Sequence, residues 1–198
     1  MFSFFRHQKQ APTLEQQLET LQKLGIGLAE GIKVDDLLIS FDQASFEAEP
    51  YSLLLFVLGI EVEERPFGRR ISQDVWNFDT ECITGTGSYV PIVQNLASLA
   101  GQGERITEIE DFVDLEEGQA WLKYCLDGQP LTWDVEVNDD WADPMVVNYV
   151  MGDLEKPNQH FYALDNGQSA ILLFLEDGIT KELGKILPEP LMRAIPEY

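Results

Sequence analysis

The densest set of side chains that could carry chemistry is a run of acids between Trp133 and Trp141. Its members are Asp134, Glu136, Asp139, Asp140 and Asp143. Hard cations such as Ca²⁺ need several oxygen ligands that converge on one point. Asp134, Glu136 and Asn138 have the one-three-five spacing of a calcium-binding loop, so this run is a candidate metal site.

The rest of the calcium pattern is missing. The sixth position is Asp139, where the sharp turn needs glycine, and the twelfth is Met145, where the pattern requires a bidentate glutamate. Asp134 and Glu136 also fall on a predicted strand, whereas the later acids lie beyond it. We therefore expect no metal and no cofactor, and we interpret the run as a solvated surface or a protein-binding patch.

Paired carboxylates can act as general acid and base when their environments separate their pKa values. Glu116 with Glu117 and Asp139 with Asp140 are such pairs, but spacing alone selects none of them. A carboxylate-based hydrolase that uses Asp134–Asp143, with or without a divalent metal, remains our alternative hypothesis.

Other catalytic patterns are weak. The two histidines, His7 and His160, have no cysteine pair near them that would suggest zinc. The segment Gly85-Thr86-Gly87-Ser88 precedes a predicted helix and could offer backbone amides to an anion. However, it lacks the lysine of a P-loop, and Val90 stands where a dinucleotide-binding motif needs glycine.

Charge is the strongest signal about partners. The chain has 35 acids and 13 basic residues, giving a net charge of −22. Between Glu104 and Glu155 there are 15 acids, against Arg105 and Lys123 alone. Such a field repels nucleic acid and anionic membranes and attracts basic protein surfaces, so we expect neither nucleic acid nor a membrane as partner.

Tryptophan is favoured as an anchor in protein interfaces, and acids around it raise the rate of association with a basic partner. We therefore predict a non-enzymatic binding or inhibitory protein, with immunity to a basic toxin as the specific hypothesis. The predicted partner-binding residues are Trp121, Asp134, Glu136, Asp139, Asp140, Trp141 and Asp143.

The length of 198 residues fits one domain. We expect an N-terminal arm over residues 1–12, followed by a single α+β domain that is helix-rich over 13–103 and sheet-rich over 104–198. The apolar run Leu53–Leu58 is too short to span a bilayer. Pro50 can start a helix over residues 50–58 that Gly59 ends, but a strand competes with it because residues 60–63 alternate, so the choice between helix and strand stays open.

Helix starts are well marked. Thr13 with Gln16 forms a capping-box pattern ahead of a leucine stripe. A second helix is predicted over Tyr89–Leu99 with Ser88 as N-cap. A third is predicted over Pro144–Leu154 with Asp143 as N-cap, and a closing helix near Thr180–Leu187.

Two tight hairpins dominate the second half. Asp127-Gly128 is a type I′ signal, so Gln119–Leu126 should pair with Gln129–Val137 and place Leu122 opposite Trp133. Asn166-Gly167 predicts a second hairpin that joins 160–165 to 168–175. Together with the helices, these hairpins predict a mostly antiparallel sheet packed against several helices.

Location follows from the cysteines and the N-terminus. Cys82 and Cys125 lack CxxC spacing, which favours two buried, reduced thiols over one disulfide. The first residues place apolar side chains before basic ones, the reverse of a secretory signal. We expect a cytoplasmic protein.

Overall fold

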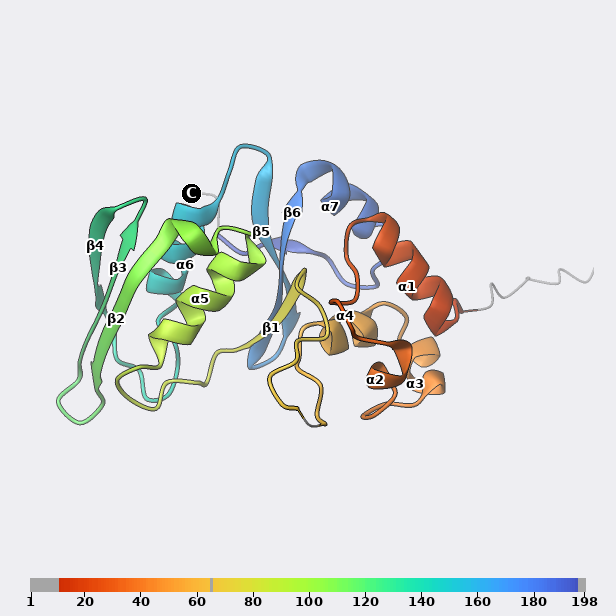
Figure 1. Ribbon diagram of the computed structural model, residues 1–198, viewed down its shortest axis with the longest axis horizontal. Coiled ribbons are helices and arrows are strands. Elements are labelled where there is room, and N and C mark those ends of the chain that lie inside the picture. The colour runs from red at the N-terminus through yellow and green to blue at the C-terminus, as the bar shows by residue number, and fades with distance from the viewer. Residues whose placement is uncertain (1–10, 65, 196–198) are drawn as a thin grey trace, which may run out of the picture.

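A computed structural model describes residues 11–64 and 66–195 of the chain (Figure 1). The predicted α+β class, with mostly antiparallel sheet, two tight hairpins and several packed helices, is confirmed. Most of the predicted N-terminal arm, residues 1–10, lies outside the described residues. The helices of five or more residues are α1 (Leu14–Lys23), α3 (Gln43–Ala48), α4 (Ser52–Leu58), α5 (Tyr89–Leu99), α6 (Pro144–Leu154) and α7 (Asp177–Leu183).

The described strands form two separate antiparallel sheets. One has the order β1-β6-β5-β7 and the other the order β2-β3-β4. The strands are β1 (Val75–Asp79), β2 (Ile106–Asp114), β3 (Gln119–Leu126), β4 (Gln129–Val135), β5 (Gln159–Asn166), β6 (Ser169–Glu176) and β7 (Met192–Arg193).

The first hairpin has the predicted register. Leu122 lies opposite Trp133, and Trp121 lies opposite Asp134. The turn residues Asp127 and Gly128 have φ angles of 50° and 78°, as a type I′ turn requires. The turn chemistry and the alternation of apolar residues therefore fix the same pairing.

The second hairpin is displaced by one residue from the prediction. Asn166 pairs with Ser169, so the two turn residues are Gly167 and Gln168 rather than Asn166 and Gly167. Only Gly167 has a positive φ, 73°, which is the requirement of a II′ turn with glycine first. The Asn166 side chain instead donates to the Ser169 hydroxyl at 2.8 Å and closes the hairpin.

Residues 50–58, left open by the sequence, form a helix. In α4, Leu54, Leu55 and Leu58 are fully buried, which is the spacing of one helical face. The competing strand does not form, and at residues 60–63 only an isolated bridge joins Glu61 to Arg70. Packing of the apolar helix face outweighs the short alternation.

The remaining helices agree with the sequence to different degrees. The capping box of Thr13 and Gln16 is present at α1. The bounds of α5 and α6 are those predicted. The closing helix α7 begins at Asp177, three residues earlier than expected, because β6 ends at Glu176 and the chain enters the helix directly.

The β1-β6-β5-β7 sheet stands between two apolar cores (Figure 1). Leu164 and Leu173 belong to the core that holds α1 and α4. Phe161 and Leu172 belong to the core that holds α5, α6 and the inner residues of β3. Both faces of β5 and β6 are therefore covered, as their uninterrupted apolar sequences predict.

The β2-β3-β4 sheet forms one end of the molecule and packs on α5 and α6 (Figure 1). Leu122 and Tyr124 point inward and are buried, whereas Lys123, Thr132 and Asp134 point outward and are exposed. No helix in the described parts of the chain is long and apolar enough to cross a membrane.

Candidate functional site

The solvent side of the β2-β3-β4 sheet, here called the outer face, carries an aromatic pair beside an acid. Trp121 lies between Phe112 on β2 and Asp134 on β4. The rings of Phe112 and Trp121 stack with centroids 6.1 Å apart, and Phe112 is 36% exposed. Lys123 Nζ lies 4.1 Å from the centre of the Trp121 ring. The outer face therefore carries an exposed Phe112 ring and a half-buried Trp121 ring, with the Lys123 ammonium over Trp121 and the Asp134 carboxylate beside it.

The turn between β2 and β3 meets the loop after β4. Glu116 and Glu117 from the turn, together with Asp139 and Asp140 from the loop, line an open depression of about 740 Å³. All four side chains are exposed. These four acids, here called the acidic rim, lie far apart in the sequence, and only the fold brings them together.

Trp141 is held at the base of the same loop. Isolated bridges pair it with Glu81 and with Asn138, and its side chain is 38% exposed. It lines a hollow of about 430 Å³ together with Glu136 and Pro144. The ring is therefore accessible to a partner that contacts the loop.

Asp143 differs from the other predicted site residues. It is 6% exposed, its Oδ1 accepts the Met145 N–H at 2.8 Å, and its Oδ2 accepts the Glu136 N–H at 2.9 Å. The first bond is the N-cap of α6 that the sequence predicts. The second closes the loop that presents the acidic rim, so in this structure Asp143 positions the surface from beneath.

A second buried acid, Asp111 on β2, was not singled out by the sequence. Its carboxylate accepts N–H groups from Gly87, from Tyr89 at 2.6 Å and from Val90 at 3.3 Å. It therefore occupies the N-terminus of α5, where Ser88 holds the N-cap position without a side-chain capping bond. The backbone amides that the sequence offered to an external anion are used by an internal carboxylate.

A sequence signal for Asp111 did exist. On β2 it lies two residues before the buried Val113, where alternation expects an apolar side chain. An acid at an inward-facing strand position needs buried donors. The glycine-rich segment ahead of α5 was the available set of donors, although nothing in the spacing linked the two.

Two tyrosines join these elements. The Tyr89 hydroxyl accepts the Asp143 N–H at 2.8 Å, and burial raises the pKa of Tyr89 to about 12. The Tyr124 hydroxyl donates to Asp153 at 2.6 Å and accepts from Trp133 Nε1 at 3.0 Å. Burial raises the pKa of Tyr124 as well, and the bond to Asp153 adds to this shift. Both hydroxyls are neutral structural links at physiological pH.

His160 and the two cysteines have different surroundings. His160 Nδ1 is 3.0 Å from Glu155, and its Nε2 is 3.7 Å from Asp177, at the opposite end of β5 from the turn. Cys82 and Cys125 are free thiols, as expected, but both are partly exposed rather than buried. Desolvation is the main cause that raises the pKa of each thiol.

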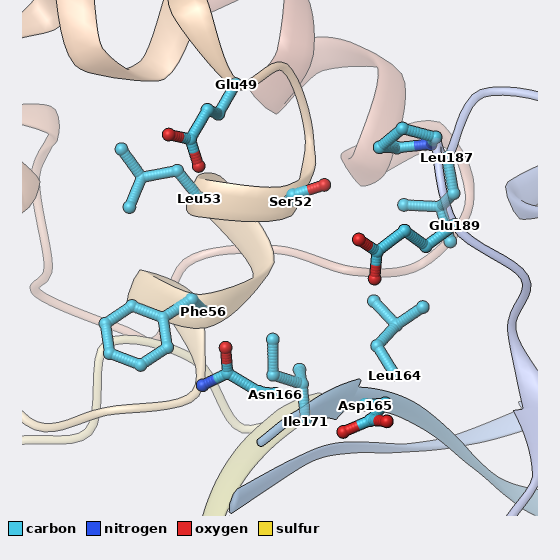
Figure 2. A pocket seen from close by; sticks show the side chains of 11 residues that line it. Glu49, Ser52, Leu53, Phe56, Leu164, Asp165, Asn166, Ile171, Leu187 and Glu189 are labelled. Atoms are coloured by element: carbon cyan, nitrogen blue, oxygen red, sulfur yellow. The ribbon is translucent and has the colours of Figure 1, made fainter.

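A further hollow of about 320 Å³ lies in the other half of the molecule, between α4 and the β5–β6 hairpin (Figure 2). Its wall is mixed, with the apolar Leu53, Phe56 and Leu187 beside polar and acidic side chains, and Figure 2 shows the Glu189 carboxylate turned toward the space between α4 and β5. Glu49 and Asp165 also line it. Its charge favours a cation, and no sequence pattern indicated it.

Within residues 11–64 and 66–195, no group of three or more histidine, cysteine, aspartate or glutamate side chains could hold a metal ion. In comparisons with known protein families, curated proteins and solved structures, nothing matches the chain. The proposal below therefore rests on the geometry and charge of the molecule alone.

Proposed function

We propose that this chain is a non-enzymatic binding or inhibitory protein that engages a basic protein partner, specifically as an immunity protein that neutralises a basic toxin in the cytoplasm. The observation that supports this best is that one end of the molecule combines exposed acids with aromatic rings, of which Phe112 and Trp141 are exposed and Trp121 is half-buried. The outer face supplies Phe112 and Trp121, and the acidic rim lies beside it.

The charge at this end is free to act on a partner. Asp134, Glu136, Asp139 and Asp140 are all exposed. By contrast, Asp127 is paired with Arg105 at 2.5 Å, and Asp153 is engaged by Tyr124. Exposed, unneutralised acids raise the rate at which a cationic protein associates and disfavour nucleic acid and anionic lipid.

The aromatic rings would supply the binding affinity that exposed charges alone do not provide. Exposed surface charges contribute little net affinity because water solvates them well. Aromatic side chains give a large contact area for little conformational entropy, and they are frequent anchors in interfaces. Trp141 is suited to this role because it is 38% exposed and lines a hollow with Glu136. Trp121 is half-buried beside Asp134, with Lys123 over its ring, and would contribute at the edge of the contact. The alternative of a carboxylate-based hydrolase stays a prediction.

The test is a comparison of two variants with the same net charge. The first carries Asp134→Lys, Glu136→Lys and Asp140→Lys, and the second carries Glu30→Lys, Asp35→Lys and Glu64→Lys, which are exposed acids in the other half. Asp143 is left unchanged because its removal would disturb α6. Each tagged protein is used for pull-downs from the native cytoplasm at low and high salt, with mass spectrometry of the retained proteins.

We expect a basic protein that is retained by the parent chain and by the second variant, released by salt, and lost with the first variant. Loss with both variants would show that net charge alone is responsible. Retention by both would place recognition elsewhere on the molecule. Either result would contradict the proposed surface.

A further inference from the structure

Within residues 11–64 and 66–195, no strand pairs with the outer edge of β4. In the order β2-β3-β4 it pairs with β3 alone, and it forms the outermost strand at one end of the molecule (Figure 1). Pro130, Thr132 and Asp134 are all exposed along it. An uncovered edge strand presents unpaired N–H and C=O groups to solvent.

The hairpin geometry identifies these groups. In a two-residue hairpin the residues that flank the turn, Leu126 and Gln129, form a hydrogen-bonded pair, and every second pair after it does the same. The backbone groups of Thr132 and Asp134 therefore point away from β3. Glu136, next in this series, confirms the direction because its outward N–H reaches Asp143.

The other outer strands have some of their outward backbone groups occupied. On β2, the outward N–H and C=O of Val113 both bond to the Thr86 hydroxyl, at 3.0 and 3.3 Å. On β1, the Asn77 N–H bonds to the Gly59 carbonyl at 2.8 Å. β7 is only two residues long. The open stretch of β4 lies at the end of the molecule that carries the acids.

An apolar strip runs beside this edge on the inner side. Met145 and Tyr149 lie one turn apart on α6 and are 46% and 41% exposed. The Tyr149 ring stacks on Trp133 of β4, with centroids 4.5 Å apart. A strand added to β4 would therefore place alternate side chains over this strip and the others beside Asp134 on the outer face.

We propose that β4 is the docking edge for an extended segment of the basic partner, which adds to the sheet as a fourth strand and alternates basic with apolar residues. This inference rests on the proposed function and names its mode of contact. Main-chain hydrogen bonds give such strand addition its affinity, and alternate side chains give it specificity.

The same features disfavour a second copy of this chain as the occupant. Pairing two β4 edges would bring acidic strands together, since each carries Asp134 and is followed by Glu136. Like charges side by side on paired strands are destabilising. Pro130 also removes one outward N–H, a common device against self-association of edges. A cationic strand satisfies the acids and still finds the N–H groups of Thr132 and Asp134.

The experiment uses the full chain and a synthetic peptide of about seven residues, the length that spans the open edge, alternating lysine with valine. A matched peptide carries N-methyl groups at alternate residues, which removes the N–H groups facing β4. Binding is followed by NMR, and amide hydrogen exchange is measured at Thr132 and Asp134. The chain variants are Thr132→Pro, which removes one outward N–H, and Thr132→Val, which keeps it.

We expect the unmodified peptide to slow exchange of both amides about tenfold or more, and N-methylation to weaken binding by a similar factor. Thr132→Pro should weaken binding, whereas Thr132→Val should not. The exchange measurement on the parent chain gives an answer even if Thr132→Pro fails to fold.

Peptide binding could weaken with salt and with the triple lysine variant, yet be unaffected by N-methylation and leave both amides unprotected from exchange. That result would overturn strand addition and leave the proposed function supported. Failure of the peptide to bind would also overturn it, and the pull-down would then decide the proposed function separately.

Discussion

Four aspartates in the second half of the chain have two opposite roles. Asp111 and Asp143 are internal caps of helices, whereas Asp134 and Asp140 contribute charge to the surface. The first two are 7% and 6% exposed, and backbone N–H groups at the starts of α5 and α6 occupy their carboxylates. The second two face solvent. One dense acidic segment therefore supplies both buried helix caps and exposed surface charge. Burial is what distinguishes the capping aspartates from the exposed ones.

Of the four aspartates, Asp111 is expected to contribute most to the free energy of unfolding. Asp111→Ala leaves the N–H groups of Gly87, Tyr89 and Val90 without their acceptor, so we expect the free energy of unfolding to fall by about 3 kcal/mol. Urea denaturation measures this. Asp111→Asn, which keeps one acceptor oxygen, should lose less, and equal losses for the two variants would contradict the capping role.

The fall in stability at alkaline pH tests the burial of the Tyr89 hydroxyl, which accepts the Asp143 N–H. Because the pKa of Tyr89 is raised to about 12 in the folded state, its stabilising contribution is complete below the unfolded pKa near 10. It is lost as the pH rises to about 12, and we expect a loss of about 2 kcal/mol from this residue.

Denaturation of the parent chain and of Tyr89→Phe across this pH range measures the Tyr89 contribution by difference. Tyr124 contributes in the same direction in both proteins and therefore cancels. The variant should show the shallower decline, and identical slopes would mean that the Tyr89 hydroxyl is open to solvent.

A smaller effect is expected at Asp143. Asp143→Ala removes the N-cap of α6 and the acceptor for the Glu136 N–H, and we expect a loss of about 1 to 2 kcal/mol in the free energy of unfolding. Amide exchange at Glu136 should become faster at the same time. Asp143→Ser, which can still cap α6, should retain most of the stability, and a full loss in this variant would argue against the capping explanation.

The smallest effect on stability is expected for the exposed acids. Asp134→Ala and Asp140→Ala should each change the free energy of unfolding by less than about 0.5 kcal/mol, because each removes a solvated charge from a strongly negative surface. Thermal denaturation at low salt is the measurement. A loss as large as that at Asp143 would show that these side chains are structural and would remove the distinction drawn above.

Some elements could be predicted because their signals are local. The register of the β3–β4 hairpin follows from Asp127-Gly128 together with the alternation around Leu122. The start of α6 follows from Asp143-Pro144. The predicted turn of the second hairpin was wrong by one residue because both Asn166 and Gly167 tolerate turn conformations. Only the pairing of Asn166 with Ser169 selects the II′ turn.

The candidate site divides in the same way. The exposed acids and Trp141 could be named from composition and neighbourhood in the sequence. Two groupings could not be predicted, because each depends on which strands and turns become neighbours. They are the pair Phe112 and Trp121, and the meeting of Glu116 and Glu117 with Asp139. Whether any of them binds a partner stays a prediction.

The sequence by itself determined the α+β class, the type I′ hairpin, the helix caps at Thr13 and Asp143, and a strongly negative surface, because turn chemistry, capping and net charge act over a few residues or over the whole chain. Only long-range contacts decide that residues 52–58 form a helix, that Asp111 fills the α5 terminus, and that no strand in the described parts of the chain pairs with the outer edge of β4. Each of these depends on contacts between segments distant in the chain, where burial and the supply of hydrogen-bond partners outweigh local preference.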